Sequence, residues 1–377
     1  MSSARKPASR TYVNLAPGDP APNFVQRLGS NEGYAFNRAA GRYVALCFIA
    51  SAGDRQGAAA MDAAYARRDL FDDVRASFFA VTLDRRDDNE ARLRPDQACF
   101  RDLDGSVSRL YGCLPHDFKT EEASVPARRF WLVLDPMLRV LRSFPFAEGK
   151  EIPEVFAFLD SLPPPERHAG IELQAPILFL PNVFDPDLCR RLIGLYEAHG
   201  GNESGFMREV GGKTVVINDP VHKRRRDHIL TDQTIIDETK ACILRRIVPE
   251  IAKAHQFHVT RMERFIVACY SADEEGHFNA HRDNTTKGTA HRRFAVSLNL
   301  NDDYEGGELS FPEFGPRRFK PPAGAAVVFS CSLLHQASLV TRGKRYVFLP
   351  FLYDEAAAKI REANNKFLDD AVGPYKA

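Results

Sequence analysis

The chain has 377 residues, more than the roughly 250–300 that one hydrophobic core usually supports, so we expect two domains. Hydrophobic residues make up 44% and charged residues 27%, an ordinary globular composition, and the formal net charge is only +1. This balance creates no overall field that would attract nucleic acid or a membrane surface, and we expect neither as a partner.

Cysteine usage and the N-terminal segment indicate the compartment. Seven cysteines are scattered without a C-x-x-C pair, mostly inside apolar runs such as VALCFIA, which indicates reduced thiols. The opening residues MSSARKPASRTY are basic but lead into no apolar segment, so we expect no secretory signal. Apolar runs are also too short for a membrane span. We therefore expect a cytoplasmic protein.

The first half of the chain alternates strand-like and helix-like segments. RYVALCFIA, SFFAVTLD and RRFWLVLDP are apolar runs typical of strands buried on both faces. AAAMDAAYARRDLFDDV is rich in alanine and predicts a helix, as does IPEVFAFLDSL near the end of this half. The alternation predicts an α/β domain with a parallel-type sheet.

Three segments of this half resemble the peroxiredoxins, a family of thiol peroxidases. They are LAPGDPAPNF, CFRDLDGSVSRLYGC and RRFWLVLDPMLRVLRSFPF, and the resemblance spans residues 14–162. It implies a thioredoxin-like α/β fold and matches Arg129 to the family's active-site arginine. The family carries its reactive cysteine on the loop after the first buried strand, but the loop here, SAGDRQGAAA, has none.

The missing cysteine predicts an inactive domain. Cys47 lies inside the preceding strand, where a thiol is buried and inert. We expect the domain to act as a structural unit, or as a surface for a protein partner or for dimerisation. An alternative is a thiol-dependent redox protein in which Cys99 or Cys113 reacts.

A proline-rich break separates the two halves. LPPPERHAG, residues 162–170, contains three consecutive prolines followed by charge and glycine, which neither a helix nor a central strand tolerates. We predict a linker at 163–170 and a second domain over 171–355.

The second half opens with a helix and continues with short strands. Asp185 is a candidate N-cap, Pro186 occupies the first helical position and Gly200 ends the helix. A second helix is predicted at 232–248. From residue 261 onward, short apolar strands separated by turn residues predict a sandwich or a small barrel.

One segment of this half, HFNAHRD at 277–283, carries candidate metal ligands. Residues i and i+2 of an extended segment share a face, so His281 and Asp283 are expected to project together. His335 follows on a later predicted strand. Two histidines and one carboxylate on adjacent strands form the facial triad of non-haem Fe(II) oxygenases, although H-x-D alone is common in solvated loops.

Residues 176–353 resemble the catalytic domain of the prolyl 4-hydroxylase group of 2-oxoglutarate- and Fe(II)-dependent dioxygenases. The resemblance rests on CYSADEEGHFNAHRDN, RRFAVSLNLNDDYEGGELSFPE and FKPPAGAAVVFSCSLLHQASLVTRGKRYVFLPFL, after the opening PILFLPNVFDPDLCRRLI. It implies a double-stranded β-helix (jelly-roll) domain with flanking helices.

The resemblance also implies roles for individual residues. His281, Asp283 and His335 would bind Fe(II), and Arg345 would hold the distal carboxylate of 2-oxoglutarate. Lys344 and Arg342 are alternatives to Arg345, but strand alternation should turn Lys344 to the opposite face. Tyr270 would contact the cosubstrate unless it is a core aromatic, and Asn299 is a further candidate for the cosubstrate pocket.

The implied reaction is hydroxylation with O2, in which 2-oxoglutarate is converted to succinate and CO2. Ascorbate is left open as an accessory reductant. The carboxylate of Asp283 favours hydroxylation, because halogenating relatives lack it. The substrate remains open between a prolyl residue in a peptide, an amino acid and a small metabolite. The alternative is a protein that binds metal or a partner without turnover.

Two other polar features lie near this motif. We interpret His277 and His291 as loop or rim residues rather than metal ligands. HKRRRDH, residues 222–228, is interpreted as a solvated basic loop, because charge runs usually are, with an acidic or peptide partner left open.

Overall fold

The computed structural model describes residues 10–373 and 375, apart from 89–92, 94–96 and 120–126. The basic residues at 1–9 therefore lie outside the described part of the chain. Two compact units are present, the first extending to Gln174 and the second beginning at Ala175, with Pro312–Gly315 grouped with the first. No helix in the described residues is both long and apolar enough to span a membrane.

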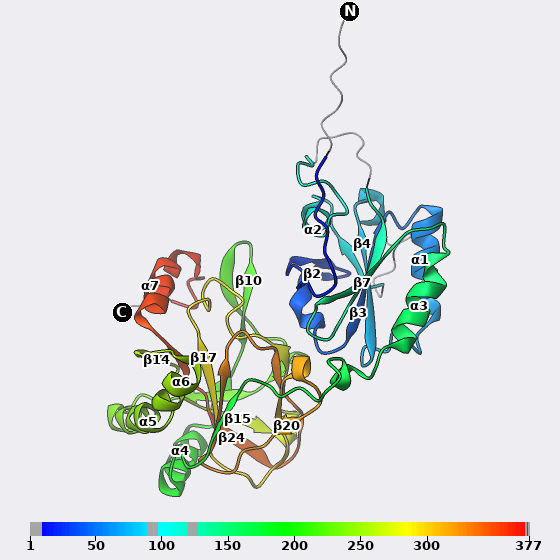
Figure 1. The fold of residues 1–377 in the computed structure, drawn as a ribbon. Helices are drawn as coiled ribbons and strands as arrows, with labels where there is room; N and C mark the ends of the chain where they lie inside the picture. Colours follow the sequence, from blue (N-terminus) through cyan, green and yellow to red (C-terminus); the bar gives the residue numbers. More distant parts are fainter. Residues whose placement is uncertain (1–9, 89–92, 94–96, 120–126, 374, 376–377) are drawn as a thin grey trace, which may run out of the picture. The chain divides into compact units, whose positions relative to one another are not determined.

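The first unit is a seven-stranded mixed sheet with helices on its faces (Figure 1). Its strand order is β2-β1-β5-β4-β3-β6-β7. The strands are β1 (Val25–Leu28), β2 (Asn31–Ala35), β3 (Tyr43–Ala50), β4 (Ala76–Thr82), β5 (Cys99–Arg101), β6 (Phe130–Leu134) and β7 (Val140–Pro145), and the helices are α1 (Arg55–Ala66), α2 (Ser106–Leu110) and α3 (Glu151–Ser161).

Only part of this sheet is parallel. β3, β4 and β5 pair in parallel, whereas β6 and β7 are antiparallel to their neighbours. The expectation of a parallel-type sheet was therefore wrong for β6, because an apolar run identifies a strand buried on both faces but not its direction. The central order β5-β4-β3-β6-β7, with helices covering the sheet, is that of a thioredoxin-like fold.

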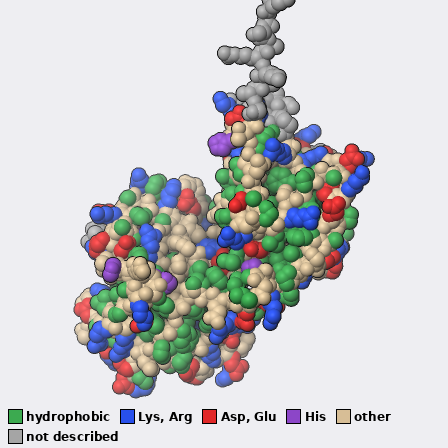
Figure 2. Space-filling view, in the orientation of Figure 1, with side chains coloured by type: hydrophobic (Ala, Val, Ile, Leu, Met, Phe, Trp, Pro, Cys, Tyr) green, Lys and Arg blue, Asp and Glu red, His purple; other side chains and the backbone are tan. Residues whose placement is uncertain are grey.

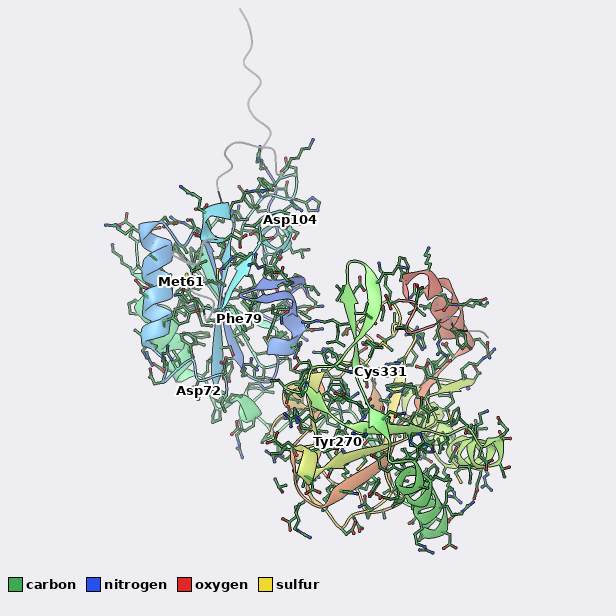
Figure 3. The ribbon with its side chains drawn as sticks, turned by 180° about the vertical axis from the view of Figure 1, so that it is seen from behind. Met61, Asp72, Phe79, Asp104, Tyr270 and Cys331 are labelled. Atoms are coloured by element: carbon green, nitrogen blue, oxygen red, sulfur yellow. The ribbon has the colours of Figure 1, made fainter. Side chains whose placement is uncertain are left out.

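An apolar core of the first unit lies under α1 and α3. It contains the fully buried Trp131 and side chains from β3, β4, α1 and α3. Asp54 caps α1 by accepting hydrogen bonds from the backbone of Gln56 and Gly57, and Phe79 lies in the central sheet (Figure 3). Figure 2 shows acidic and basic side chains interspersed on the visible surface, as the net charge of +1 leads one to expect.

The second unit is a jelly roll flanked by helices. Its larger sheet runs β14-β25-β17-β24-β15-β13-β9, with β21 and β8 attached through β17, and its smaller sheet runs β12-β16-β22-β19-β20. The strands are β8 (Leu178–Leu180), β9 (Asn202–Glu203), β10 (Phe206–Val210), β11 (Lys213–Ile217), β12 (Lys223–Arg224), β13 (Arg226–Ile229), β14 (Arg261–Glu263), β15 (Ile266–Ser271), β16 (His277–His281), β17 (Phe294–Asn299), β18 (Glu305–Gly306), β19 (Leu309–Ser310), β20 (Arg318–Phe319), β21 (Ala326–Ser330), β22 (His335–Ala337), β23 (Val340–Arg342), β24 (Lys344–Phe348) and β25 (Phe351–Tyr353).

Helices flank the larger sheet, and the last of them follows strand β25 along the chain (Figure 1). They are α4 (Pro186–His199), α5 (Gln233–Arg246), α6 (Val248–His255) and α7 (Glu355–Ala363). The predicted ends of α4 are confirmed: Asp185 accepts a hydrogen bond from the Leu188 backbone, and Gly200 adopts a left-handed conformation after the last turn. The larger sheet is thus held by a helical layer while its other side faces the polar residues described next.

Candidate metal and cosubstrate site

The smaller sheet of the second unit and the turn that follows β16 bring His281, Asp283 and His335 together. One ligand atom of each residue lies within 4.8 Å of the ligand atoms of the other two. Among the described residues, these three form a cluster that could hold a metal ion. His281 and His335 are direct partners in the antiparallel pairing of β16 with β22. The Asp283 carboxylate lies 3.7 Å from His281 Nε2 and 3.3 Å from His335 Nε2.

The backbone fixes the tautomer of both imidazoles. His281 Nδ1 lies 2.8 Å from the carbonyl oxygen of Asn279, and His335 Nδ1 lies 3.0 Å from that of Leu333. A carbonyl oxygen only accepts, so each Nδ1 carries the hydrogen and each Nε2 keeps its lone pair. The Nε2 atoms are those near the carboxylate, so the donor set fits a divalent cation.

Asp283 reaches the site by a different route from the one predicted. β16 ends at His281, so Asp283 lies in the following turn rather than on the same strand. Its backbone N–H donates to the carbonyl of Cys331, 3.0 Å away, which fixes the turn beside the histidines. The i, i+2 argument therefore selected a residue that does lie beside His281, although the strand had already ended.

Aromatic side chains pack against both histidines of the triad. Phe278 stacks on the His281 ring at a centroid distance of 3.5 Å, and Phe329 packs edge-on against His335 at 4.6 Å. Burial, with a smaller contribution from His335, lowers the pKa of His281 well below its usual value. The imidazole is therefore neutral near pH 7, as a metal ligand must be.

Arg345 is a buried guanidinium held by neutral partners. Its side chain donates to Ser297 Oγ at 2.9 Å and to Asn299 Oδ1 at 3.1 and 3.3 Å, and the residue is only 2% exposed. It has no acidic partner among the described residues. Lys344 points the other way, is exposed and pairs with Glu197. Asn299 is itself buried and also donates to Tyr304, so it is oriented toward Arg345.

Tyr270 on β15 is the direct partner of Arg345 on β24 in the larger sheet of the second unit (Figure 3). The guanidinium carbon of Arg345 is 5.5 Å from the centre of the Tyr270 ring, and the Tyr270 hydroxyl accepts a hydrogen bond from Arg225 at 3.4 Å. Tyr270 is also part of an apolar cluster with Phe278 and Val347. Its ring therefore packs in the apolar core and also borders the Arg345 side chain.

The interpretation of residues 222–228 as a solvated loop was wrong for two of its four Lys and Arg residues. Lys223 and Arg225 are each 6% exposed, whereas Arg224 and Arg226 lie outside and pair with Glu275 and Glu274. The alternation arises because β12 pairs within the smaller sheet and β13 within the larger one, so the chain passes from one sheet to the other between these two strands. Composition alone could not show which members of the run turn inward.

The remaining histidines near the motif are not part of the cluster. His277 hydrogen-bonds to backbone carbonyls of Glu275 and Val221. His291 was expected at the rim but is buried, with Nε2 3.1 Å from Glu263. Its neighbour Arg292 donates to Glu263 at 2.8 Å and to the Asp283 carbonyl at 3.4 Å. Arg292 was missed, because the sequence gives no sign that Glu263 would be buried beside it.

The first unit offers no accessible thiol among its described residues. Cys47, Cys99 and Cys113 are all buried. Burial raises the pKa of Cys47 well above its usual range and that of Cys99 and Cys113 to about 12. Arg129 is held by Asp54 at 3.0 Å, so its charge is already neutralised. These features argue against a reactive Cys99 or Cys113.

Comparison with known families places this geometry in context. Residues 265–353 match the family model described as 2OG-Fe(II) oxygenase superfamily, so the second unit carries a domain of that superfamily, whose members use Fe(II) and 2-oxoglutarate. A PKHD-type hydroxylase of Pseudomonas fluorescens (strain Pf0-1) is 40% identical over 90 residues, covering 22% of this chain and 39% of that protein. One of Polaromonas sp. is 51% identical over 51 residues, covering 13% and 22%. The chain thus spans less than half the length of these curated relatives.

Solved structures similar to parts of the chain fall into two groups. A prolyl-4-hydroxylase from Pseudomonas putida is 16% identical and covers 48% of this chain and 94% of its own, with a TM-score of 0.38. Peroxidoxin BcpB from Mycobacterium tuberculosis is 18% identical and covers 40% of this chain and 99% of its own, with a TM-score of 0.35.

Proposed function

We propose that the second unit, with its 2OG-Fe(II) oxygenase domain, is an Fe(II)- and 2-oxoglutarate-dependent hydroxylase. The observation that carries the proposal is the pairing of a neutral-imidazole and carboxylate triad with a buried arginine that has no acidic partner among the described residues. An unpaired charge inside a protein is costly, so its retention implies an anionic ligand. 2-Oxoglutarate supplies a carboxylate for Arg345 and donor atoms for the metal.

Each residue of the site then has a defined task. His281, Asp283 and His335 would hold Fe(II) through Nε2 and carboxylate oxygens. Ser297 and Asn299 fix the fork of Arg345, which would bind the distal carboxylate of 2-oxoglutarate. Phe278 and Phe329 pack against the two histidines and fix their rings. Iron and 2-oxoglutarate, when bound with O2, supply the oxidising power that hydroxylates the substrate and yields succinate and CO2.

The test uses the full chain. Anaerobic addition of Fe(II) and then 2-oxoglutarate should produce a visible charge-transfer band, which is absent with either component alone. Admission of O2, with ascorbate as accessory reductant, should then release succinate from 2-oxoglutarate. A chain that binds Fe(II) but neither forms the band nor releases succinate would exclude this function and leave non-catalytic metal binding.

We further propose that the first unit acts as a surface for a protein partner or for dimerisation rather than as a peroxidase. Its buried thiols and the neutralised Arg129 support this. Sedimentation equilibrium of the full chain, together with hydrogen peroxide consumption in the presence of dithiothreitol, tests it. Peroxide turnover faster than that of dithiothreitol alone would overturn it.

A further inference from the structure

Lys223 is a buried side chain without an acidic hydrogen-bond partner among the residues that the structure describes. Its Nζ donates to Ser204 Oγ at 2.7 Å and to the Gly205 carbonyl at 2.6 Å, both neutral oxygens. An ammonium has three N–H groups, so one remains for another acceptor. The Nζ atom also lies 5.0 Å from the centre of the Phe278 ring. Burial, followed by the nearby Arg225 charge, lowers the pKa of Lys223 well below its usual value. An anionic ligand beside the amine would favour its charged form.

Arg225 lies beside Lys223 and is held more firmly. It forms a two-pronged pair with Asp227 at 2.7 and 2.8 Å, and its Nη2 also donates to Ser204 Oγ at 3.2 Å. Its Nη1 makes only the long 3.4 Å contact with Tyr270. Because both cations donate to Ser204 Oγ, they are held within a few ångströms of one another, and Asp227 offsets only one of them.

This cationic pair lies against the proposed reaction site. Phe278, which contacts Lys223, stacks directly on the metal ligand His281. Tyr270, which contacts Arg225, packs beneath Arg345. The pair therefore lies along the wall that connects the triad with the cosubstrate arginine.

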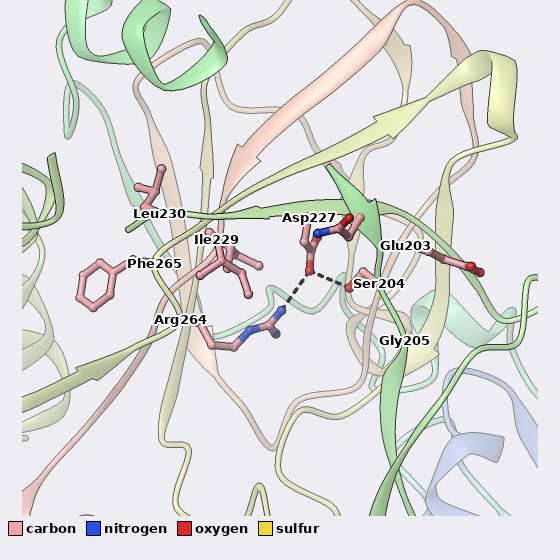
Figure 4. Close-up of a pocket in the computed structure, with 10 residues that line it drawn as sticks. Glu203, Ser204, Gly205, Asp227, Ile229, Leu230, Arg264 and Phe265 are labelled. Carbon is pink, nitrogen blue, oxygen red and sulfur yellow. Dashed lines mark hydrogen bonds and ion pairs between the residues drawn. The ribbon is translucent and has the colours of Figure 1, made fainter. Parts of the chain in front are cut away.

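Counting the charges of the proposed complex shows which cation lacks a counter-ion. Fe(II) with Asp283 and Arg345 carries two net positive charges, which the 2-oxoglutarate dianion offsets. Arg225 is offset by Asp227. Lys223 remains, and its charged form has no carboxylate within hydrogen-bonding distance among the described residues. Arg264 also touches Asp227, at 3.2 Å, but it lines a surface pocket of about 490 Å³ and is partly solvated (Figure 4).

We infer that the substrate carries an oxyanion, a carboxylate or a phosphate, that is bound by Lys223 and Arg225 beside the metal site. The inference rests on the proposed hydroxylase function and narrows its substrate to anionic molecules. Lys223 supplies a point charge and its remaining N–H, and Arg225 supplies the free N–H of Nη1. Both are substrate-binding groups and take no part in holding the metal or 2-oxoglutarate.

The experiment is calorimetric titration of the anaerobic protein loaded with Fe(II) and saturating 2-oxoglutarate. The probes are matched pairs in which only one partner carries an oxyanion: propionate against propionamide, and glycerol 3-phosphate against glycerol. We expect at least one acidic probe to bind about 10-fold or more tightly than its neutral partner, because hydrogen bonds to charged groups contribute most to such discrimination. The pair with the larger ratio identifies carboxylate or phosphate as the source. A constant charge-transfer band shows that the probe has not displaced 2-oxoglutarate.

Two variants distinguish binding of the anion at Lys223 from a general effect of nearby positive charge. Lys223→Met keeps an unbranched chain against Phe278 and should weaken the acidic probe about 10- to 100-fold without changing the neutral one. Arg226→Gln removes a neighbouring but exposed charge and should leave both unchanged. Equal binding of acidic and neutral probes, no binding of any acidic probe, or equal losses in both variants would overturn the inference. Absence of the band in the unmodified protein would instead overturn the hydroxylase function itself.

Discussion

Tyr270 and Arg345 are direct partners across β15 and β24, and the guanidinium carbon of Arg345 lies 5.5 Å from the centre of the phenol ring. The ring, Ser297 and Asn299 together restrict the arginine without neutralising it. Holding a charge in place while leaving it unpaired prepares the site for an anion, because little reorganisation is needed when the ligand arrives.

Replacing Arg345 should affect the cosubstrate and not the metal. Arg345→Gln removes the charge while keeping hydrogen-bonding capacity, so we expect the 2-oxoglutarate affinity to fall about 10- to 100-fold and Fe(II) affinity to stay within about 2-fold. Titration of the charge-transfer band measures the first and anaerobic calorimetry the second. Lys344→Gln is the matched control, because that neighbouring cation is exposed and pairs with Glu197. Parallel losses of both affinities in Arg345→Gln would contradict the assigned role.

The metal ligands can be tested against a histidine of the same strand. His281→Ala and Asp283→Ala should each abolish the charge-transfer band, because two remaining ligands hold Fe(II) poorly. His277→Ala, four residues earlier on β16, removes an imidazole that binds only backbone carbonyls and should leave the band intact. If the band persists in His281→Ala and disappears in His277→Ala, the ligand assignment is wrong.

Glu263 should be a large contributor to the stability of the second unit. It is buried and accepts from His291, Arg292 and Arg361, the last of which belongs to α7. Glu263→Gln leaves the Arg292 and Arg361 guanidinium groups without their carboxylate and should lower the free energy of unfolding by about 3–5 kcal/mol. Glu355→Gln removes an exposed carboxylate that pairs with Arg261 and should cost at most about 1 kcal/mol. Urea unfolding followed by circular dichroism measures both.

The buried carboxylate of Glu263 also leads to a prediction of how stability depends on pH. The Arg292 guanidinium, followed by His291, outweighs burial and lowers the pKa of Glu263 from its ordinary value of 4.5. The stabilisation is therefore complete above about pH 5 and is lost as pH falls below 4.5 toward the folded-state pKa. The stability difference between the unmodified protein and Glu263→Gln should shrink in that range. Trp131, the single tryptophan, lies in the first unit, so its fluorescence reports separately on that unit. A difference that grows on acidification would contradict the assignment.

The thiols should be unreactive in the folded protein. At pH 8 a thiol whose pKa is about 12, as for Cys99 and Cys113, is ionised to about one part in ten thousand. All seven cysteines are buried, so Ellman's reagent should label none within minutes and all seven in denaturant. Val74→Cys, placed at an exposed position, is the control and should react at once. Rapid labelling of a native cysteine would reopen a thiol-dependent function.

The sequence by itself determined the features that depend on local chemistry. The ends of α4 follow from Asp185, Pro186 and Gly200, because capping involves residues within one turn of the helix. The candidate ligands and Arg345 were identifiable because few residue types bind Fe(II) or a carboxylate, and their order along the chain restricts the choice further.

Tertiary structure alone decided which charges are buried. β12 and β13 pair with different sheets, so Lys223 and Arg225 are buried while Arg224 and Arg226 stay outside. The turn that places Asp283 is fixed by a backbone hydrogen bond to Cys331, 48 residues away in the numbering of the chain. Such pairings depend on strands distant in sequence, and a local pattern contains no information about them. The candidate metal ligands could therefore be identified from the sequence, whereas the burial of the cationic pair Lys223 and Arg225 beside them depends on the fold.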